Sequence, residues 1–171
     1  ENKVNDPNIF AFRSIRRLAA LMDFDCSQTE EISTALNLSK TEIHYLAQLA
    51  SLIKKVNINL KKADLTRILY KYSKIALIDS ILVKYSKQYS TVRNHLVPRE
   101  KDWLRIIEII RTINEDTLVF PLKGQDAINL GIPAGPQISK FLKLTEVWWL
   151  TKGCRATRDE CLIKLQYLIN K

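Results

Sequence analysis

The sequence KGQDAINLGIPAGPQI, residues 123–138, holds three of the four glycines in a chain of 171 residues. Gly131 lies where a short helix must end, at a position that favours a left-handed backbone conformation. Asp126 can cap this helix by accepting N–H groups of the residues that follow it. Gly135-Pro136 then opens a second helix, with proline in the first turn, where its missing N–H costs nothing. The stretch predicts two helices joined by a tight hairpin.

The start of the second helix is a candidate anion site. Free backbone N–H groups and the positive end of the helix dipole at Gly135 and Pro136 can hold a phosphate. Lys140 follows one helical turn later, and Lys123 lies at the mouth of the hairpin. A purely structural helix–helix corner would use the same glycines, and the spacing alone leaves both interpretations open.

The rest of the chain also has helical patterns. Capping boxes, in which Ser or Thr precedes Glu by three residues, mark helix starts at Ser27, Ser39 and Thr157. Apolar residues recur at helical spacing in four sets: Ile43, Leu46, Ala47, Ala50 and Ile53; Leu65, Ile68, Leu69 and Tyr72; Ile75, Ile78, Leu82 and Tyr85; and, after Pro98, Trp103, Ile106, Ile107 and Ile110. We therefore expect an all-α fold, with a helical body domain over residues 1–113, a joint that begins at Asn114, and a small helical tail domain over residues 114–171 that carries the glycine-bearing hairpin.

The net charge of +9 is concentrated in the middle of the chain. Residues 40–113 hold 15 Lys and Arg against 6 Asp and Glu, which gives +9 for this segment alone. A basic surface of this size favours a nucleic-acid partner, although a solvated lysine-rich surface has the same composition. Four tyrosines are interleaved with these lysines, as suits RNA binding, but half-buried core tyrosines recur at the same spacing: Tyr70, Tyr72, Tyr85 and Tyr89.

The C-terminal part of the chain contains the pattern G-x-D-x-x-x-L-G-I-x-x-G-P-x-I over residues 124–138, followed by Phe141-Leu142, Glu146-Val147-Trp148-Trp149 and Gly153. This set of residues resembles the C-terminal end of bacterial tRNA nucleotidyltransferases (CCA-adding enzymes) and their poly(A) polymerase relatives. Upstream, Arg17–Leu21, Leu38–Glu42 and Arg67–Tyr70 resemble the helical body of the same enzymes, in the same order. The resemblance therefore spans most of the chain.

The resemblance implies a role in holding tRNA. In this family a head transfers nucleotides with metal ions, a neck selects the base, and the body and tail hold the tRNA. This chain resembles body and tail alone, either as a piece of a longer protein or as a product whose head and neck are encoded elsewhere. We expect it to bind tRNA or another RNA in 3′-end (CCA) maturation and to be inactive alone. Mg²⁺ and nucleotides are then expected only at the missing head, and the choice between CCA and poly(A) addition lies there too.

The sequence contains two short matches to catalytic motifs. Asp23-Phe24-Asp25 has the spacing of the metal-binding carboxylates of nucleotidyltransferases, but no glycine precedes residue 124, and an interhelical loop is the better interpretation. Asp64-Leu65-Thr66-Arg67 resembles the base-selecting neck motif, yet an intrahelical acid–base pair explains it better. His44 and His95 have no Cys, Asp or Glu at metal-ligand spacing. We therefore predict no catalytic and no metal-binding residue in this chain.

The expected RNA-binding residues lie in the tail: Lys123, Gly135, Pro136, Lys140, Lys152, Arg155 and Arg158. Gly124, Asp126 and Gly131 are expected to shape the corner instead of touching RNA. Trp148 and Trp149 cannot both be buried on one helix face, so we expect one in the core and the other exposed.

Two other functions remain open. The hairpin Leu130–Gly135 also resembles that of helix-hairpin-helix DNA-binding domains, and an adaptor that docks a catalytic head would need no nucleic-acid affinity. Three cysteines without metal-ligand spacing, no signal peptide and only short apolar runs favour a cytoplasmic protein with free thiols and no membrane partner.

Overall fold

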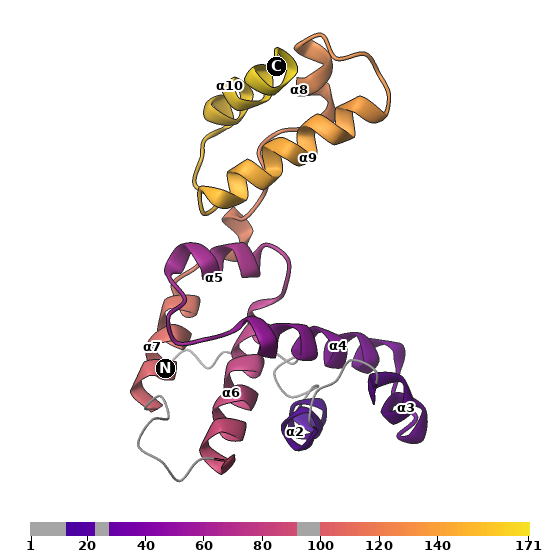
Figure 1. Ribbon diagram of the computed structural model, residues 1–171, viewed down its shortest axis with the longest axis vertical. Helices are drawn as coiled ribbons and strands as arrows, with labels where there is room; N and C mark the ends of the chain where they lie inside the picture. The colour runs from indigo at the N-terminus through magenta and orange to yellow at the C-terminus, as the bar shows by residue number, and fades with distance from the viewer. Residues whose placement is uncertain (1–12, 23–27, 92–99) are drawn as a thin grey trace. The chain divides into compact units, whose positions relative to one another are not determined.

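The computed structural model describes residues 13–22, 28–91 and 100–171, of which 28–30 and 89–91 by their backbone alone, and it confirms the all-α fold (Figure 1). These residues form helices and no strand, and no helix among them is long and apolar enough to cross a membrane. In chain order they are α2 (Arg13–Leu21), α3 (Gln28–Ala35), α4 (Lys40–Lys55), α5 (Lys62–Leu69), α6 (Lys74–Thr91), α7 (Glu100–Arg111), the 3-10 helix η1 (Glu115–Thr117), α8 (Gly124–Asn129), α9 (Pro136–Thr151) and α10 (Arg158–Ile169). The sequence features at Asp23-Phe24-Asp25, Ser27, His95 and Pro98 lie outside the described residues.

The chain forms two compact units. The first unit comprises Glu1–Leu60 and Tyr72–Thr112, and the second comprises Lys61–Lys71 and Ile113–Lys171. Helix α5 therefore packs with the elements of the tail, although its sequence lies within the expected body domain. The chain passes from the first unit to the second, returns, and passes to the second again.

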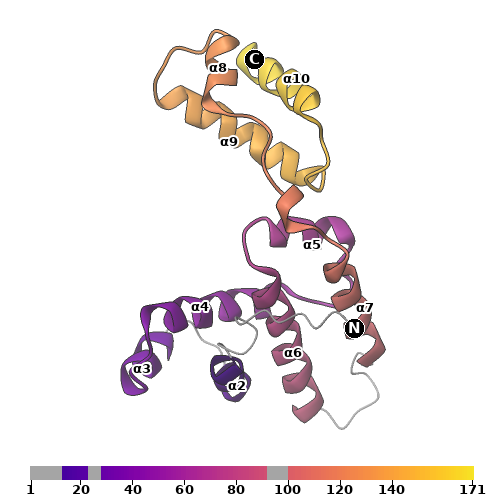
Figure 2. The same ribbon diagram turned by 180° about the vertical axis from the view of Figure 1, so that it is seen from behind.

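In the first unit, α6 is the central helix, and it packs against α2, α4 and α7 (Figure 2). A buried carboxylate ties three of these helices together. Asp79 of α6 is 6% exposed, and one of its oxygens pairs with Arg16 Nη1 of α2 at 2.7 Å. The other oxygen accepts a hydrogen bond from the Tyr45 hydroxyl of α4 at 2.9 Å. Burial, reinforced by the Asp79 charge, raises the pKa of Tyr45 far above its usual value, so its hydroxyl stays a donor.

The expected apolar stripes are confirmed in α7 but not in α6. Trp103, Ile106, Ile107 and Ile110 are all buried. In α6, by contrast, the four expected residues are half-buried or exposed, and the core residues are Ala76, Leu77, Ile81 and Val83. Because α6 has neighbours on several sides, it is apolar around most of its circumference, and a period of 3.6 fits more than one face. In α4 the stripe is rotated in part: Leu46 and Ala50 are buried as expected, Ala47 is exposed, and Tyr45, Leu49 and Leu52 join the core.

Two of the three expected capping boxes are confirmed. The Ser39 hydroxyl accepts the Glu42 N–H, and the Thr157 hydroxyl accepts the Glu160 N–H, while each glutamate accepts the N–H of its partner. The expected role of Asp126 was wrong in detail. Asp126 is the third residue of α8, and its carboxylate accepts the N–H of Lys123, the residue before the helix, at 2.7 Å. Asp126 therefore accepts the backbone N–H of the N-cap residue, as the glutamate of a capping box does.

Gly131 ends α8 as expected. Its φ is +89°, its N–H donates to the Ile128 carbonyl at 2.9 Å, and the Ile132 N–H donates to the Ala127 carbonyl at 3.1 Å. This pair of bonds satisfies the last carbonyls of the helix and packs Ile132, which is 4% exposed, against Ala127. The glycine thus fixes the direction in which the chain leaves α8.

Gly153 ends α9 in the same manner, with a φ of +66° and with bonds from Gly153 N–H to Leu150 and from Cys154 N–H to Trp149. A second constraint acts here, because a Cβ at residue 153 would lie 3.1 Å from the Cβ of Ala63 in α5. A Cβ at residue 131 would meet no atom within 4 Å. Both glycines are therefore required by a positive φ, but only at residue 153 would an added side chain also meet a neighbouring atom.

We predict that Gly153→Ala destabilises the second unit more than Gly131→Ala does. Gly131→Ala should cost about 1–2 kcal/mol from left-handed strain alone. Gly153→Ala should cost that strain plus the contact with Ala63, and Ala63→Gly in the same chain should recover about 0.5 kcal/mol or more as a coupling energy. Urea unfolding of the four variants and of the parent measures this cycle. Additivity of Gly153→Ala and Ala63→Gly would contradict the prediction.

Candidate nucleic-acid interface

The second unit is built around Trp149, which is 2% exposed. Its indole N–H donates to the Ala156 carbonyl at 3.1 Å. Its ring makes edge-to-face contacts with Tyr70, at 5.3 Å between centroids, and with Phe120, at 5.7 Å. Trp149 therefore joins α9 to α5, to the segment before α8 and to the loop before α10. It is the core member expected of the tryptophan pair.

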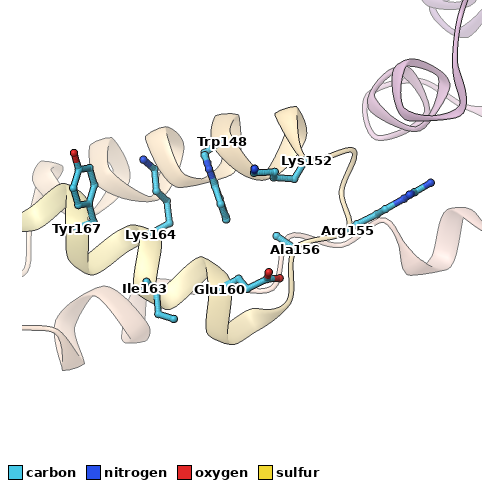
Figure 3. Close-up of a pocket in the computed structure, with 8 residues that line it drawn as sticks. All are labelled: Trp148, Lys152, Arg155, Ala156, Glu160, Ile163, Lys164 and Tyr167. Carbon is cyan, nitrogen blue, oxygen red and sulfur yellow. The ribbon is translucent and has the colours of Figure 1, made fainter.

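Trp148, the other member of the pair, is half-buried and faces a groove. Neighbouring residues on a helix point about 100° apart, so the burial of Trp149 turns Trp148 away from the centre of the core. The groove measures about 640 Å³. Figure 3 shows that its lining comes from the end of α9, from the following loop and from α10: Trp148, Lys152, Arg155, Ala156, Glu160, Ile163, Lys164 and Tyr167.

The groove combines aromatic rings with positive charge. Lys152 Nζ lies over the Trp148 ring, 5.8 Å from its centroid, and Lys164 Nζ lies 4.8 Å from the centroid of Tyr167. Arg155 adds a third, exposed cation. Among these lining residues Glu160 carries the opposing charge, and one of its oxygens is occupied by the Thr157 N–H at 2.7 Å. The arrangement can hold a planar ring against an aromatic face and an anionic group beside it.

The expected RNA-binding residues fall at the two ends of α9. Lys152 and Arg155 line the groove. Gly135, Pro136 and Lys140 belong to the first turns of the helix, and its 16 residues extend about 24 Å. Gly124 lies at that same end, because a Cβ on it would be 3.9 Å from Ile138, and Lys123 precedes it. The structure therefore does not gather these residues into one site.

Arg158, an expected RNA-binding residue, has a partner within the protein. Its guanidinium pairs with the Asp126 carboxylate at 2.6 Å, where the Asp126 side chain is only 10% exposed. This ion pair links α10 to α8 within the second unit. The Arg158 guanidinium is thus paired with a carboxylate of its own unit while its side chain stays 52% exposed. Asp126 supports the corner through two different bonds.

The first turn of α9 offers fewer open N–H groups than the sequence suggests. Pro136 has no N–H, and the Ile138 N–H donates to the Gly135 carbonyl at 3.2 Å. Gly135 itself has a φ of +154° and a ψ of −169°, a conformation that side-chain-bearing residues rarely adopt. The glycine is therefore required by the backbone, whatever binds there.

The lysines expected to form a broad surface in the middle of the chain belong to both units, and some of them have partners within the protein. Lys84 is half-buried and donates to the carbonyls of Ile53 and Val56, at 3.0 and 2.6 Å, and burial lowers its pKa. Lys55 donates to the Tyr72 hydroxyl at 2.9 Å. Four other basic residues belong to the second unit: Lys61, Lys62, Arg67 and Lys71. That unit holds 12 Lys and Arg against 7 Asp and Glu, and its charge is +5.

Tyr70 attaches α5 to α9 through Glu146. The Tyr70 hydroxyl donates to one oxygen of Glu146 at 2.6 Å, and Lys143 Nζ donates to the other at 2.8 Å. Burial, together with the bond to Glu146, raises the pKa of Tyr70 to about 12. Burial also raises the pKa of Glu146, but the hydrogen bonds from Lys143 and Tyr70 outweigh it and hold that pKa below its usual value.

Arg67 and His44, both considered above as candidate functional residues, have partners within their own helices. Arg67 pairs with Asp64 at 2.6 Å, which confirms the intrahelical acid–base pair. His44 is exposed, and its ring nitrogen lies 2.9 Å from the Gln48 amide. Across residues 13–22, 28–91 and 100–171, no three His, Cys, Asp or Glu side chains form a group that could hold a metal ion.

Sequence reasoning missed three of the α10 residues that line the groove, Ile163, Lys164 and Tyr167. A signal was present, since Lys164 and Tyr167 are three residues apart on a helix and Ile163 and Tyr167 are four apart. That spacing does not say whether a face is buried, and here Ile163 is 68% and Tyr167 58% exposed.

The described residues therefore form an all-α protein whose second unit carries a groove lined by aromatic rings and cations. Comparison of the chain with protein-family models, with curated proteins and with solved structures finds no match in any of the three.

We predict that the second unit loses stability at high pH through Tyr70. Because the pKa of Tyr70 is about 12 in the folded protein, above the ordinary value of 10.0, its contribution is complete below pH 10 and is lost as the pH rises toward 12. Urea unfolding of the parent and of Tyr70→Phe between pH 8 and pH 12 measures it. The stability difference between the two should shrink over that range. A difference that stays constant would contradict the prediction.

Proposed function

We propose that this chain binds RNA through the second unit, and that the RNA is tRNA, as the sequence resemblance implies. The observation that carries the proposal is the groove in which two aromatic rings are flanked by Lys152, Arg155 and Lys164. In this proposal the chain holds the RNA, and nucleotidyl transfer is performed by a head and neck outside it.

The chemistry of the groove supports this choice. RNA-binding surfaces combine basic residues for the phosphates with aromatic side chains on which bases stack. Beside the cations lie a half-buried tryptophan and a tyrosine that is 58% exposed. An ordinary solvated lysine surface is not expected to carry such aromatic side chains. The charge of +5 on the second unit adds a long-range attraction for a polyanion.

The resemblance supplies the further choice of tRNA. Its glycine-rich pattern over residues 124–138 builds the α8–α9 corner, and the same helix α9 carries Trp148 to the groove at its other end. The groove alone supports RNA as a class and does not choose among RNAs. A direct comparison of tRNA with other nucleic acids is therefore the appropriate test.

We predict that Lys152→Gln/Arg155→Gln flattens the salt dependence of tRNA binding. Removal of one phosphate-binding cation should reduce the slope of log K against log salt by about 0.7–0.9, so the double variant should bring a reduction of about 1.4–1.8. The measurement is fluorescence anisotropy with a labelled tRNA that lacks its CCA end, over a series of salt concentrations. The matched control, Lys101→Gln/Arg111→Gln on α7, removes the same charge from exposed positions of the first unit and should leave the slope nearly unchanged.

The parent protein decides between the candidate functions in the same experiment. Steep binding that prefers tRNA over duplex DNA of equal length would support the proposal. A preference for the DNA duplex would instead favour the helix-hairpin-helix function. Absence of salt-dependent binding to either would leave the adaptor function, in which the positive charge is solvated.

A further inference from the structure

The Trp148 ring is the part of the groove best suited to a flat ligand. The burial of Trp149 beside it holds this section of α9 in place, so Trp148 is presented on a rigid helix and not on a loop. Its indole is half-buried, with Lys152 across the ring at 5.8 Å. An aromatic ring whose position is fixed before binding loses little entropy when a second ring stacks on it.

Tyr167 and Ile163 provide apolar surface on the α10 side. They lie one turn apart, on a helix that packs against α9, and they are 58% and 68% exposed. Lys164, whose Nζ lies over the Tyr167 ring, is half-buried between the two helices in this region (Figure 3). Figure 3 draws the Lys164 side chain between Trp148 and Tyr167, so a ring ligand is best placed against the Trp148 face, and it can stack there only if one of its own faces is free.

We propose that the groove takes an unpaired nucleobase against Trp148, with the adjoining phosphates on Lys152 and Arg155, so that its ligand is a single-stranded segment of RNA. This inference rests on the proposed RNA-binding function and adds the class of RNA element recognised. A base inside a duplex has both faces stacked on its neighbours, whereas a base in a loop or at an end can be splayed out.

The incoming base must displace Lys152 from the ring, and the relative strengths allow it. An exposed cation–π contact contributes roughly 2- to 5-fold to an equilibrium constant. Base–aromatic stacking contributes roughly 5- to 150-fold to affinity. Lys152 is exposed and carries a long side chain, so its ammonium can move from the ring to the phosphate that arrives with the base.

The charges around the groove favour RNA over a protein segment. Lys152, Arg155 and Lys164 line it against Glu160, whose carboxylate is bound by the Thr157 N–H. An apolar protein helix would have to desolvate these cations without replacing their hydration. A single-stranded nucleic acid supplies both rings and anions, which are the partners that the aromatic and basic side chains of the groove can bind.

The test uses the full chain with three labelled RNAs: a short single strand, the blunt duplex of the same sequence, and tRNA lacking its CCA end. We predict that Trp148→Leu weakens binding of the single strand roughly 5- to 150-fold. Trp148→Phe keeps an aromatic face and should remain within about threefold of the parent. Tyr167→Leu, at an exposed position where the fold is not at risk, should also weaken single-strand binding. Affinity for the duplex should be unchanged in all three variants.

Tryptophan fluorescence gives a second readout. The single strand should quench emission from the parent, and Trp148→Phe should lose most of that quenching, because Trp103 and Trp149 are buried. Salt-dependent RNA binding with no effect of Trp148→Leu or Tyr167→Leu would overturn the base-stacking inference while leaving RNA binding in place. Binding of none of the three RNAs by the parent would overturn both proposals and leave a protein partner for the groove.

Discussion

The burial of Trp149 is the constraint on which the second unit depends. A single indole contacts α5 through Tyr70 and the segment before α8 through Phe120, and its N–H satisfies the carbonyl of Ala156. Such a ring buries much apolar surface, and edge-to-face contacts add to its contribution. Trp149 cannot rotate without losing all of these partners. The position of Trp148, the preceding residue on the same helix, is therefore also fixed. Core and groove are thus two faces of one helical turn.

The two ends of helix α9 have different roles. At the start, Gly135 and Pro136 turn the chain into the helix, and Gly124 lies against Ile138. About 18–24 Å further along the helix, Trp148 and Lys152 face the groove. The stretch that is most distinctive in sequence therefore builds the corner, while the chemistry suited to a ligand lies at the far end of the helix it begins. A distinctive motif and a binding site need not coincide.

Local rules predicted much of the fold. The turn at Gly131, the capping boxes at Ser39 and Thr157 and the buried face of α7 depend on residues close together in sequence, and each is present in the structure. The buried face of α6 and the internal role of Lys84 depend on which helices surround α6, and no local pattern contains that information. The same holds for the groove. Lys152 and Arg155 were expected from charge near a helix start, whereas Tyr167 faces the groove only because α10 packs on α9.

The passage of Lys61–Lys71 into the second unit has a consequence for modularity. The segment brings Tyr70 to Trp149 and Ala63 to Gly153, so the core of this unit is completed by residues encoded inside the sequence of the other. A cut after residue 113 would release a C-terminal fragment whose tryptophan lacks one of its covering rings. The core of the second unit is therefore complete only when Lys61–Lys71 and Ile113–Lys171 are both present, although the two segments are separated in sequence by part of the first unit.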